Sequence, residues 1–142
     1  MTVTFCGHAE ISEPEAVKRW LRETVSLLIA QGADTFFLGG YGAFDLMAAS
    51  VLQELKLQYP EIKSVLALAY LNQTIDKGLY DETTFPPLEF VPKRYAIRKR
   101  NEFMVQWSDV IVAYVCWPLG GAAATLQYAR RKRKRILSYA SI

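Results

Sequence analysis

Glycine residues that directly follow strand-like segments are the residues in this sequence best placed to bind a ligand through the backbone. The apolar segment Thr35–Leu38 runs into Gly39, Gly40 and Gly42, and apolar residues then recur with helical spacing. A strand, a glycine turn and a helix together aim backbone N–H groups and the positive end of a helix dipole at one point, which suits an anion. Glycine also lets a ligand approach the backbone with no Cβ between them. This turn predicts either a phosphate-binding loop or a plain strand-to-helix connection.

Two further glycine turns are predicted at the same end of the sheet. Gly7 and His8 follow the apolar segment 3–6, and Gly120 and Gly121 follow the apolar segment 110–115. In parallel sheets, ligands bind at the carboxyl ends of the strands, where the strand order reverses. Three glycine turns at one end of a sheet favour a phosphate or nucleotide site over plain turns.

The elements that must position these turns alternate along the chain. Strand-like segments are expected at 3–6, 35–38, 62–69, 110–115 and 135–139, with helical patterns at 13–31, 44–59, 96–107 and 122–131. This alternation predicts an α/β fold, a Rossmann-like three-layer sandwich with a mostly parallel sheet of about five strands. The long connection 70–95 has no strong pattern, and its aromatic residues predict an ordered lid that includes residues 80–84.

The charge of the chain is unevenly distributed. Of the 17 basic residues, six lie in the run Arg130–Arg135, and the other 11 stand against 14 acidic residues. A chain that is basic only locally is not attracted to nucleic acid over its whole surface. The run indicates either cations at a helix C-terminus or a patch for nucleic acid, and the first interpretation is favoured because no aromatic residues are interleaved with it.

Cysteine, histidine and hydropathy patterns exclude several classes of protein. The two cysteines, Cys6 and Cys116, are predicted to be buried reduced thiols, and with His8 as the one histidine no metal-ligand spacing exists. We expect a cytoplasmic protein with no metal or other cofactor. Residues 110–129 carry no charge and would be long enough to cross a membrane, but Trp117–Gly121 interrupts them. They predict a strand, a turn and a helix, and no membrane segment.

Motifs spread over nearly the whole chain carry a family resemblance. They comprise residues 5–8, 39–45, 80–83, 100–105 and 108–114, the last leading into 120–125. In this combination the chain resembles the SLOG superfamily, close to its YpsA-like branch; the superfamily also holds the LOG nucleotide phosphoribohydrolases and the DprA DNA-processing proteins. The resemblance implies one Rossmann-like domain over residues 1–142 that binds a nucleotide or nucleotide-derived ligand at its glycine loops, and it is compatible with a homodimer.

One turn departs from the enzymes of that superfamily. The LOG enzymes share a Pro-Gly-Gly-x-Gly-Thr-x-x-Glu turn that supplies glycines and a catalytic glutamate. The corresponding segment here, residues 118–127, keeps Gly120, Gly121 and Thr125 but has no acidic residue. Hydrolysis of a glycosidic bond is disfavoured by this loss, because its oxocarbenium-like transition state needs a positioned carboxylate.

Each candidate residue has a functional and a structural interpretation. Asp45 could accept a hydrogen bond from a ribose hydroxyl or activate a water. Its alternative role is that of a carboxylate at a helix start that interacts with the helix dipole. Thr125 could donate to a phosphate or bond its own backbone. Arg100 and Asn101 begin a helix where cations are unfavourable, so an anionic partner is expected. The candidate ligand-binding residues are Gly7, His8, Gly39, Gly40, Tyr41, Gly42, Arg100, Asn101, Gly120, Gly121 and Thr125.

Three functions stay open at this point. The leading hypothesis is a module that binds a nucleotide or nucleotide-derived small molecule. The second is an enzyme of phosphoribohydrolase type, a hydrolase or transferase acting at the N-glycosidic bond of a nucleotide with Asp45 or Glu82 as the carboxylate. The third is a DprA-like protein that binds nucleic acid through Arg130–Arg135.

Overall fold

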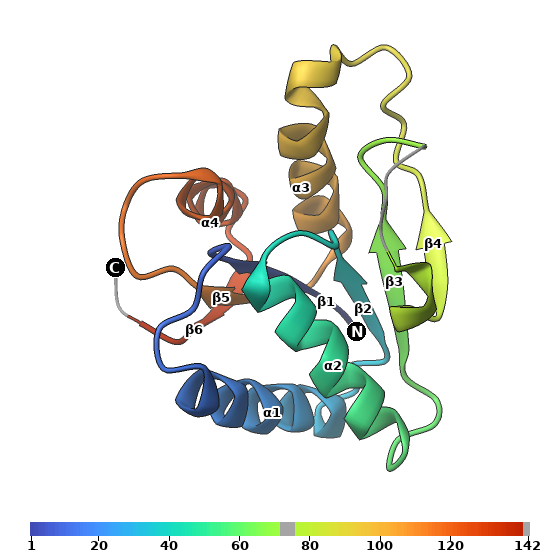
Figure 1. Cartoon of the computed structure of the whole chain (residues 1–142), viewed down its shortest axis with the longest axis vertical. Coiled ribbons are helices and arrows are strands. Elements are labelled where there is room, and N and C mark those ends of the chain that lie inside the picture. Colours follow the sequence, from blue (N-terminus) through green and yellow to red (C-terminus); the bar gives the residue numbers. More distant parts are fainter. Residues whose placement is uncertain (72–75, 141–142) are drawn as a thin grey trace.

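The computed structural model describes residues 1–71 and 76–140. In chain order the elements are β1 (Thr2–Gly7), α1 (Pro14–Ala30), β2 (Thr35–Leu38), α2 (Ala43–Lys56), β3 (Lys63–Ala67), the 3₁₀ turn Lys77–Leu79, β4 (Glu82–Thr84), the 3₁₀ turn Lys93–Tyr95, α3 (Ala96–Trp107), β5 (Val110–Tyr114), α4 (Gly121–Arg131) and β6 (Arg135–Ser138). Within the described residues, six strands form one parallel sheet in the order β4-β3-β2-β1-β5-β6 (Figure 1). The predicted α/β, Rossmann-like fold is confirmed.

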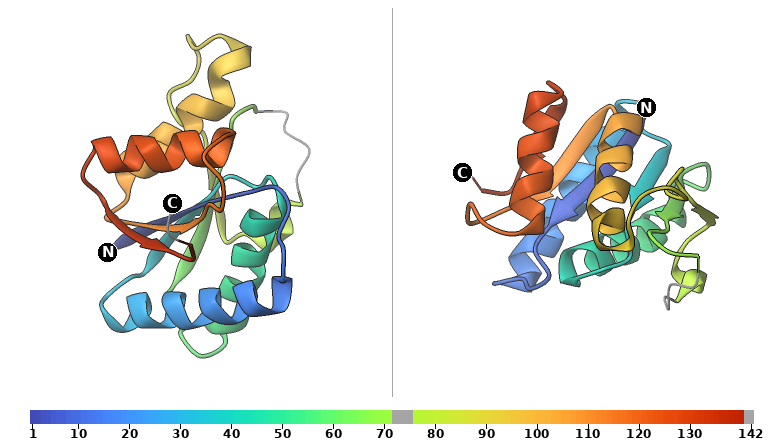
Figure 2. Two further views of the ribbon diagram at one scale, coloured as in Figure 1. Left: turned by 90° about the vertical axis from the view of Figure 1, so that its left-hand side faces the viewer. Right: turned by 90° about the horizontal axis from the view of Figure 1, so that it is seen from above.

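Helices cover both faces of the sheet. Helices α1 and α2 pack together on one face, and α3 and α4 pack together on the other, which gives three layers (Figure 2). The apolar stripe of α1, with Val17, Leu21 and Val25 fully buried at helical spacing, lies in the larger core cluster. All five residues of β5 are buried, as expected for an inner parallel strand.

The chain changes face between β1 and β5, and this position locates the site. These two strands pair in register from Val3 opposite Val110 to Gly7 opposite Tyr114. β1 leads to α1 on one face, whereas β5 leads to α4 on the other. The loops leaving the two strands therefore diverge and open a crevice at the carboxyl end of the sheet.

The sheet has six strands where the sequence predicts about five. The additional strand is β4, which pairs with β3 at the sheet edge and occupies part of the segment predicted as a lid. Its sequence, Glu-Thr-Thr, is largely exposed and has no apolar alternation to reveal a strand. Asp81 fixes this edge, because its carboxylate accepts from the Ser64 N–H at 2.8 Å and pairs with Lys56 Nζ at 2.8 Å. Residues 72–75 of the predicted lid lie outside the described residues.

The segment 110–129 folds as a strand, a turn and a helix, as predicted. Among the described residues, no helix is long and apolar enough to cross a membrane. The prediction of two buried thiols is correct for Cys6 and wrong for Cys116, which is exposed. Cys116 lies beyond the end of β5, in the loop that leaves the sheet.

Candidate functional site

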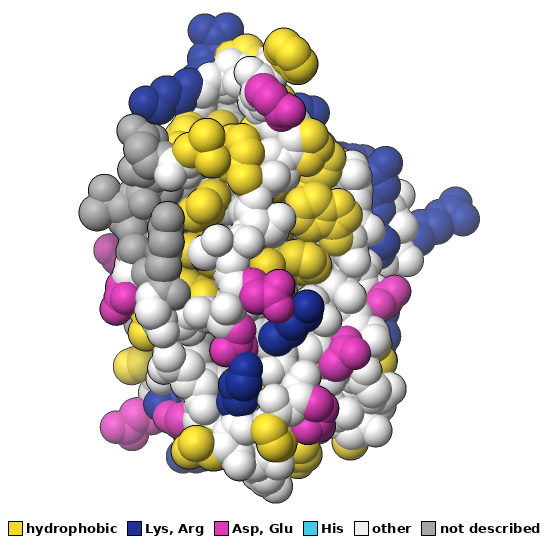
Figure 3. All heavy atoms as spheres, turned by 90° about the vertical axis from the view of Figure 1, so that its right-hand side faces the viewer, with side chains coloured by type: hydrophobic (Ala, Val, Ile, Leu, Met, Phe, Trp, Pro, Cys, Tyr) yellow, Lys and Arg dark blue, Asp and Glu magenta, His cyan; other side chains and the backbone are white. Residues whose placement is uncertain are grey.

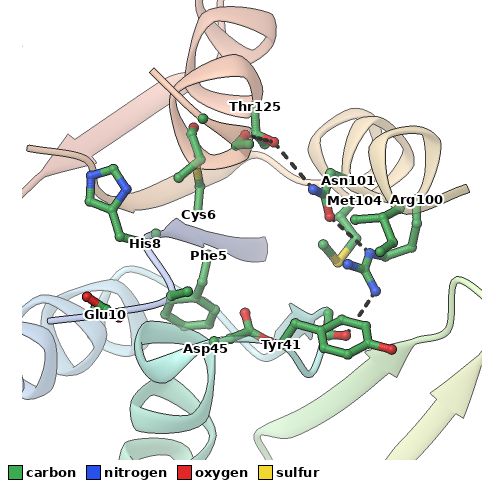
Figure 4. Close-up of a pocket in the computed structure, with 18 of the residues that line it drawn as sticks. Phe5, Cys6, His8, Glu10, Tyr41, Asp45, Arg100, Asn101, Met104 and Thr125 are labelled. Atoms are coloured by element: carbon green, nitrogen blue, oxygen red, sulfur yellow. Dashed lines mark hydrogen bonds between the residues drawn. The ribbon is translucent and has the colours of Figure 1, made fainter. Parts of the chain in front are cut away.

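A cavity of about 490 Å³ lies at the carboxyl end of the sheet, beside the point where β1 and β5 diverge. It is lined by the end of β1, by the loops that follow β1, β2 and β5, and by residues of α2, α3 and α4 (Figure 4). The sequence-predicted residues that line it are Gly7, His8, Gly39, Tyr41, Gly42, Asp45, Arg100, Asn101, Gly120, Gly121 and Thr125. Gly40 and Glu82 are not among its lining residues.

Asp45 is a partly buried carboxylate in the first turn of α2. Its Oδ2 accepts a hydrogen bond from the Gly40 N–H. Burial raises the pKa of Asp45 from its ordinary value of 3.8 to about 6, against the opposing effects of the Gly40 N–H, the Arg100 charge and the Gly39 N–H. A carboxyl group that titrates near neutrality in a cavity can accept a hydrogen bond from a ligand hydroxyl or transfer a proton.

Arg100 joins α3 to the ends of two strands. Its side chain is 3% exposed, and Nη1 donates to the Gly39 carbonyl at 2.9 Å and to the Ala67 carbonyl at 3.2 Å. Its Nε donates to Asn101 Oδ1 at 2.9 Å. Burial lowers the pKa of Arg100, and the negative charge of Asp45 acts in the opposite direction. Arg100 thus donates to two backbone carbonyls and an amide oxygen, and Asp45 is a nearby anion whose charge acts on it.

Asn101 and Thr125 form a bridge between α3 and α4. Asn101 Nδ2 donates to Thr125 Oγ1 at 3.5 Å, and the Thr125 hydroxyl donates to the Gly121 carbonyl at 3.0 Å. The threonine therefore takes the structural alternative, a bond to its own helix backbone. Figure 4 shows Arg100 and Asn101 together on one side of the cavity and His8 on the other, with Asp45 between them.

His8 is held rigidly by the neighbouring strand and loop. Its Nε2 accepts the Cys116 N–H at 2.8 Å, so the proton of the neutral imidazole lies on Nδ1. Its ring meets Tyr114 edge-on and stacks face to face on Trp117, with ring centroids 3.7 Å apart and an interplanar angle of 3°. Burial lowers the pKa of His8. Trp117 also lines the cavity, and sequence reasoning missed it because the residue was interpreted only as an interruption of an apolar segment.

The glycines of the three turns have different physical reasons to be glycine. A Cβ on Gly7 would lie 2.2 Å from the Phe44 ring, and a Cβ on Gly39 would lie 2.8 Å from Arg100 Cζ. Packing against Phe44 requires glycine at position 7, whereas a Cβ at position 39 would displace the Arg100 guanidinium. A Cβ on Gly121 would meet nothing within 4 Å, so the fold leaves open space there.

Two predicted functional elements lie elsewhere. Glu82 lies on β4 at the sheet edge and pairs with Lys63 at 3.1 Å, on a face that mixes acidic and basic side chains (Figure 3). The basic run begins at the C-terminal end of α4, opposite the helix end that opens into the cavity. Tyr128 lies beneath the Arg131 and Lys132 cations at 5.7 and 5.5 Å, an aromatic contact that the sequence pattern of the run does not reveal.

Comparison with known proteins gives relatives in sequence and in structure. No family model matches the sequence. A UPF0398 protein of Bacillus thuringiensis (strain Al Hakam) is 23% identical over 141 residues, covering 89% of this chain and 76% of that protein. DNA processing protein A of Helicobacter pylori superposes with a TM-score of 0.69 at 14% identity, covering all of this chain and 66% of that one. These relatives support the predicted resemblance to the SLOG superfamily.

A second solved structure shares this fold. The molybdenum cofactor carrier protein of Chlamydomonas reinhardtii superposes with a TM-score of 0.62 at 16% identity, covering 96% of this chain and 74% of that one. At such identities the likeness establishes the Rossmann-like fold and leaves the ligand to be argued from the residues of this chain. Its cavity combines backbone donors, a carboxyl group of raised pKa and a stacked aromatic pair.

Proposed function

We propose that the cavity binds a nucleotide or nucleotide-derived ligand, with a phosphate at the first turn of α4 and a ribose hydroxyl at Asp45. Gly121 is the observation that carries this proposal. Glycine weakens a helix by about 1 kcal/mol relative to alanine, and neither packing nor a left-handed backbone requires glycine at this position. A glycine that leaves open space at a helix N-terminus lets an anion reach the backbone N–H groups.

The starts of α2 and α4 differ in how their backbone donors are used. At α2, the Ala43 N–H donates to the Ala9 carbonyl at 2.8 Å, and the Gly40 N–H donates to Asp45. At α4, no side chain in the described part of the chain caps the helix. The first N–H groups of any helix lack partners within that helix. We therefore place the phosphate at Gly121, because backbone N–H groups near the Gly39–Gly42 turn already donate to protein acceptors.

The charges around the cavity favour a ligand with few phosphates. Asp45 and Glu10 line it, and among the described lining residues Arg100 is the one Lys or Arg side chain, with its Nε and Nη1 donating to Asn101 and to backbone carbonyls. A polyphosphate would meet carboxylates without a compensating cation. One phosphate at the dipole of α4 meets no such conflict.

An enzyme acting at the N-glycosidic bond is the second candidate, because Asp45 is a cavity carboxyl group with a pKa near 6. The turn at Gly120 and Gly121 lacks the glutamate of the LOG enzymes. Glu82 pairs with Lys63 at the β4 edge and is not among the residues that line the cavity. Asp45 is thus the carboxylate that this second function would use.

A ligand panel tests the proposed function. Thermal unfolding and calorimetric binding would be measured with AMP, GMP, CMP, UMP and a short single-stranded DNA, the last because DNA processing protein A of Helicobacter pylori is described as binding single-stranded DNA. A ligand at about 100 times its Kd stabilises the folded protein by about 2.7 kcal/mol. We expect a nucleotide to do so, and the substitution Gly121→Val to abolish the effect by filling the approach to α4.

Gln127→Val is the matched control, because Gln127 is exposed on the same helix and lines no described cavity. It should bind the nucleotide as the wild type does. Equal nucleotide binding by Gly121→Val and the control would contradict the proposal. A response to the DNA alone, unchanged in Gly121→Val, would transfer the function to Arg130–Arg135.

A further inference from the structure

The indole ring of Trp117 has one covered face and one open face. Its covered face lies against His8, with the two rings nearly parallel and their centroids 3.7 Å apart. Trp117 nevertheless keeps 46% of its surface exposed, and it lines the cavity together with His8. The face turned away from His8 is therefore a flat aromatic surface available to a ligand.

This surface is fixed before any ligand arrives. His8 is 6% exposed and is held by the Cys116 N–H at 2.8 Å and by edge-on contact with Tyr114. The stack on His8 in turn fixes the plane of the indole. A platform that is already ordered loses little conformational entropy when a ligand stacks on it.

The loop that carries Trp117 also leads directly into α4. Gly121 follows Trp117 by four residues, so one short loop contributes both the aromatic face and the open helix N-terminus. His8 lies on the side of the cavity away from Arg100, with Asp45 between them (Figure 4). The aromatic face, the carboxyl group and the helix N-terminus thus border the same cavity.

We propose that the open face of Trp117 is the platform on which the heteroaromatic base of the ligand stacks, so that the cavity selects base-bearing phosphates over plain sugar phosphates. This inference rests on the proposed nucleotide function and adds the residue that recognises the base. Stacking accepts any base with an aromatic face, and a purine covers more of the indole than a pyrimidine does. The site therefore prefers AMP or GMP to CMP or UMP.

The test compares nucleotides with ribose 5-phosphate, which lacks a base. Affinities would be measured by calorimetry for the wild type, Trp117→Ala and Trp117→Phe. Loss of one stacked base costs roughly 5- to 150-fold in affinity. We expect Trp117→Ala to weaken purine nucleotide binding within this range without changing ribose 5-phosphate binding, whereas Trp117→Phe, which retains an aromatic face, loses much less.

Fluorescence provides a second readout that a general packing defect would not reproduce. The chain has three tryptophans, and Trp107 packs against Phe37 and Phe103 and does not line the cavity. A base stacking on Trp117 should quench the emission of the wild type and of the matched control Trp107→Phe. It should not quench Trp117→Phe, although calorimetry still shows binding.

Each other outcome overturns the inference in a recognisable way. If nucleotides and ribose 5-phosphate bind the wild type equally and Gly121→Val abolishes both, the phosphate site stands and the platform does not. If Trp117→Ala weakens both ligands equally, Trp117 only supports the loop. If none of these ligands binds the wild type, the proposed function and the platform both fail.

Discussion

Replacing the Asp45 carboxylate should stabilise the protein at neutral pH. The pKa of Asp45 is about 6 in the folded protein against an ordinary value of 3.8. Between these values the folded state binds more protons than the unfolded state, so the free energy of unfolding falls as pH rises. The contribution of Asp45 to the free energy of unfolding is therefore lowest above pH 6. A shift of about two pKa units corresponds to about 3 kcal/mol.

The assay is urea unfolding of the wild type and Asp45→Asn at pH 4 and pH 8. Asparagine cannot ionise, and its carbonyl oxygen can still accept the Gly40 N–H. We expect Asp45→Asn to gain up to about 3 kcal/mol relative to the wild type on going from pH 4 to pH 8. Taking the difference between the two pH values removes any effect of the substitution that does not depend on pH.

Asp81→Asn is a control with the opposite sign. The pKa of Asp81 is lowered despite the opposing effect of burial, because the ion pair with Lys56 and the N–H of Ser64 favour its charged form. Asp81 therefore stabilises the fold above its unfolded pKa and loses that contribution as pH falls through its folded pKa. The pH-dependent change therefore lies at and below pH 3.8, so Asp81→Asn should lose stability relative to the wild type on going from pH 2 to pH 8, with little change between pH 4 and pH 8. The same pH trend for both variants, or no trend for Asp45→Asn, would refute the reasoning.

Three further predictions follow from the packing. Arg100→Met should lower the free energy of unfolding in urea by about 3 kcal/mol, because two backbone carbonyls lose a charged donor; a loss below 1 kcal/mol would contradict its bridging role. Gly7→Ala should cost about 1–3 kcal/mol in thermal unfolding, because its methyl group would overlap the Phe44 ring, and an unchanged midpoint would count against that contact. Iodoacetamide at pH 8 should modify Cys116 and spare Cys6, whose pKa burial raises to about 12, and mass spectrometry showing equal labelling would contradict this.

A cavity carboxylate that lowers the stability of the fold at neutral pH agrees with a binding role for Asp45. Proteins retain groups that reduce stability where those groups contribute to activity or binding. A ribose hydroxyl that donates to the carboxylate would favour its charged form and so lower its pKa. Binding near pH 6 would then release protons, which calorimetry in buffers of different ionisation enthalpy detects.

The sequence predicts the fold well because most of the evidence for it is local. The apolar stripe of α1 predicts a helix by its periodicity, and the β-branched apolar run of β5 predicts a buried strand. The sequence does not predict β4, because its three largely exposed residues form a strand only by pairing with β3. No local pattern distinguishes such an edge strand from a loop.

The site could be predicted as a location but not as a set of roles. Its turns lie at the strand ends, so alternation of strands and helices is enough to bring them together. Whether a glycine serves packing or a ligand depends on contacts such as Gly7 with Phe44, which are distant in sequence. The stack of Trp117 on His8 likewise joins residues more than 100 positions apart, and no spacing rule indicates it.

The central claim is that a nucleotide phosphate binds at the first turn of α4. Backbone amide NMR of the ¹⁵N-labelled protein, titrated with whichever of the four nucleoside monophosphates binds most tightly, tests it most directly. The account predicts that the largest shifts fall on the Gly121 and Ala122 amides, with smaller ones near Asp45. Shifts confined to Arg130–Arg135, with the amides of Gly121 and Ala122 unchanged at saturation, would contradict it.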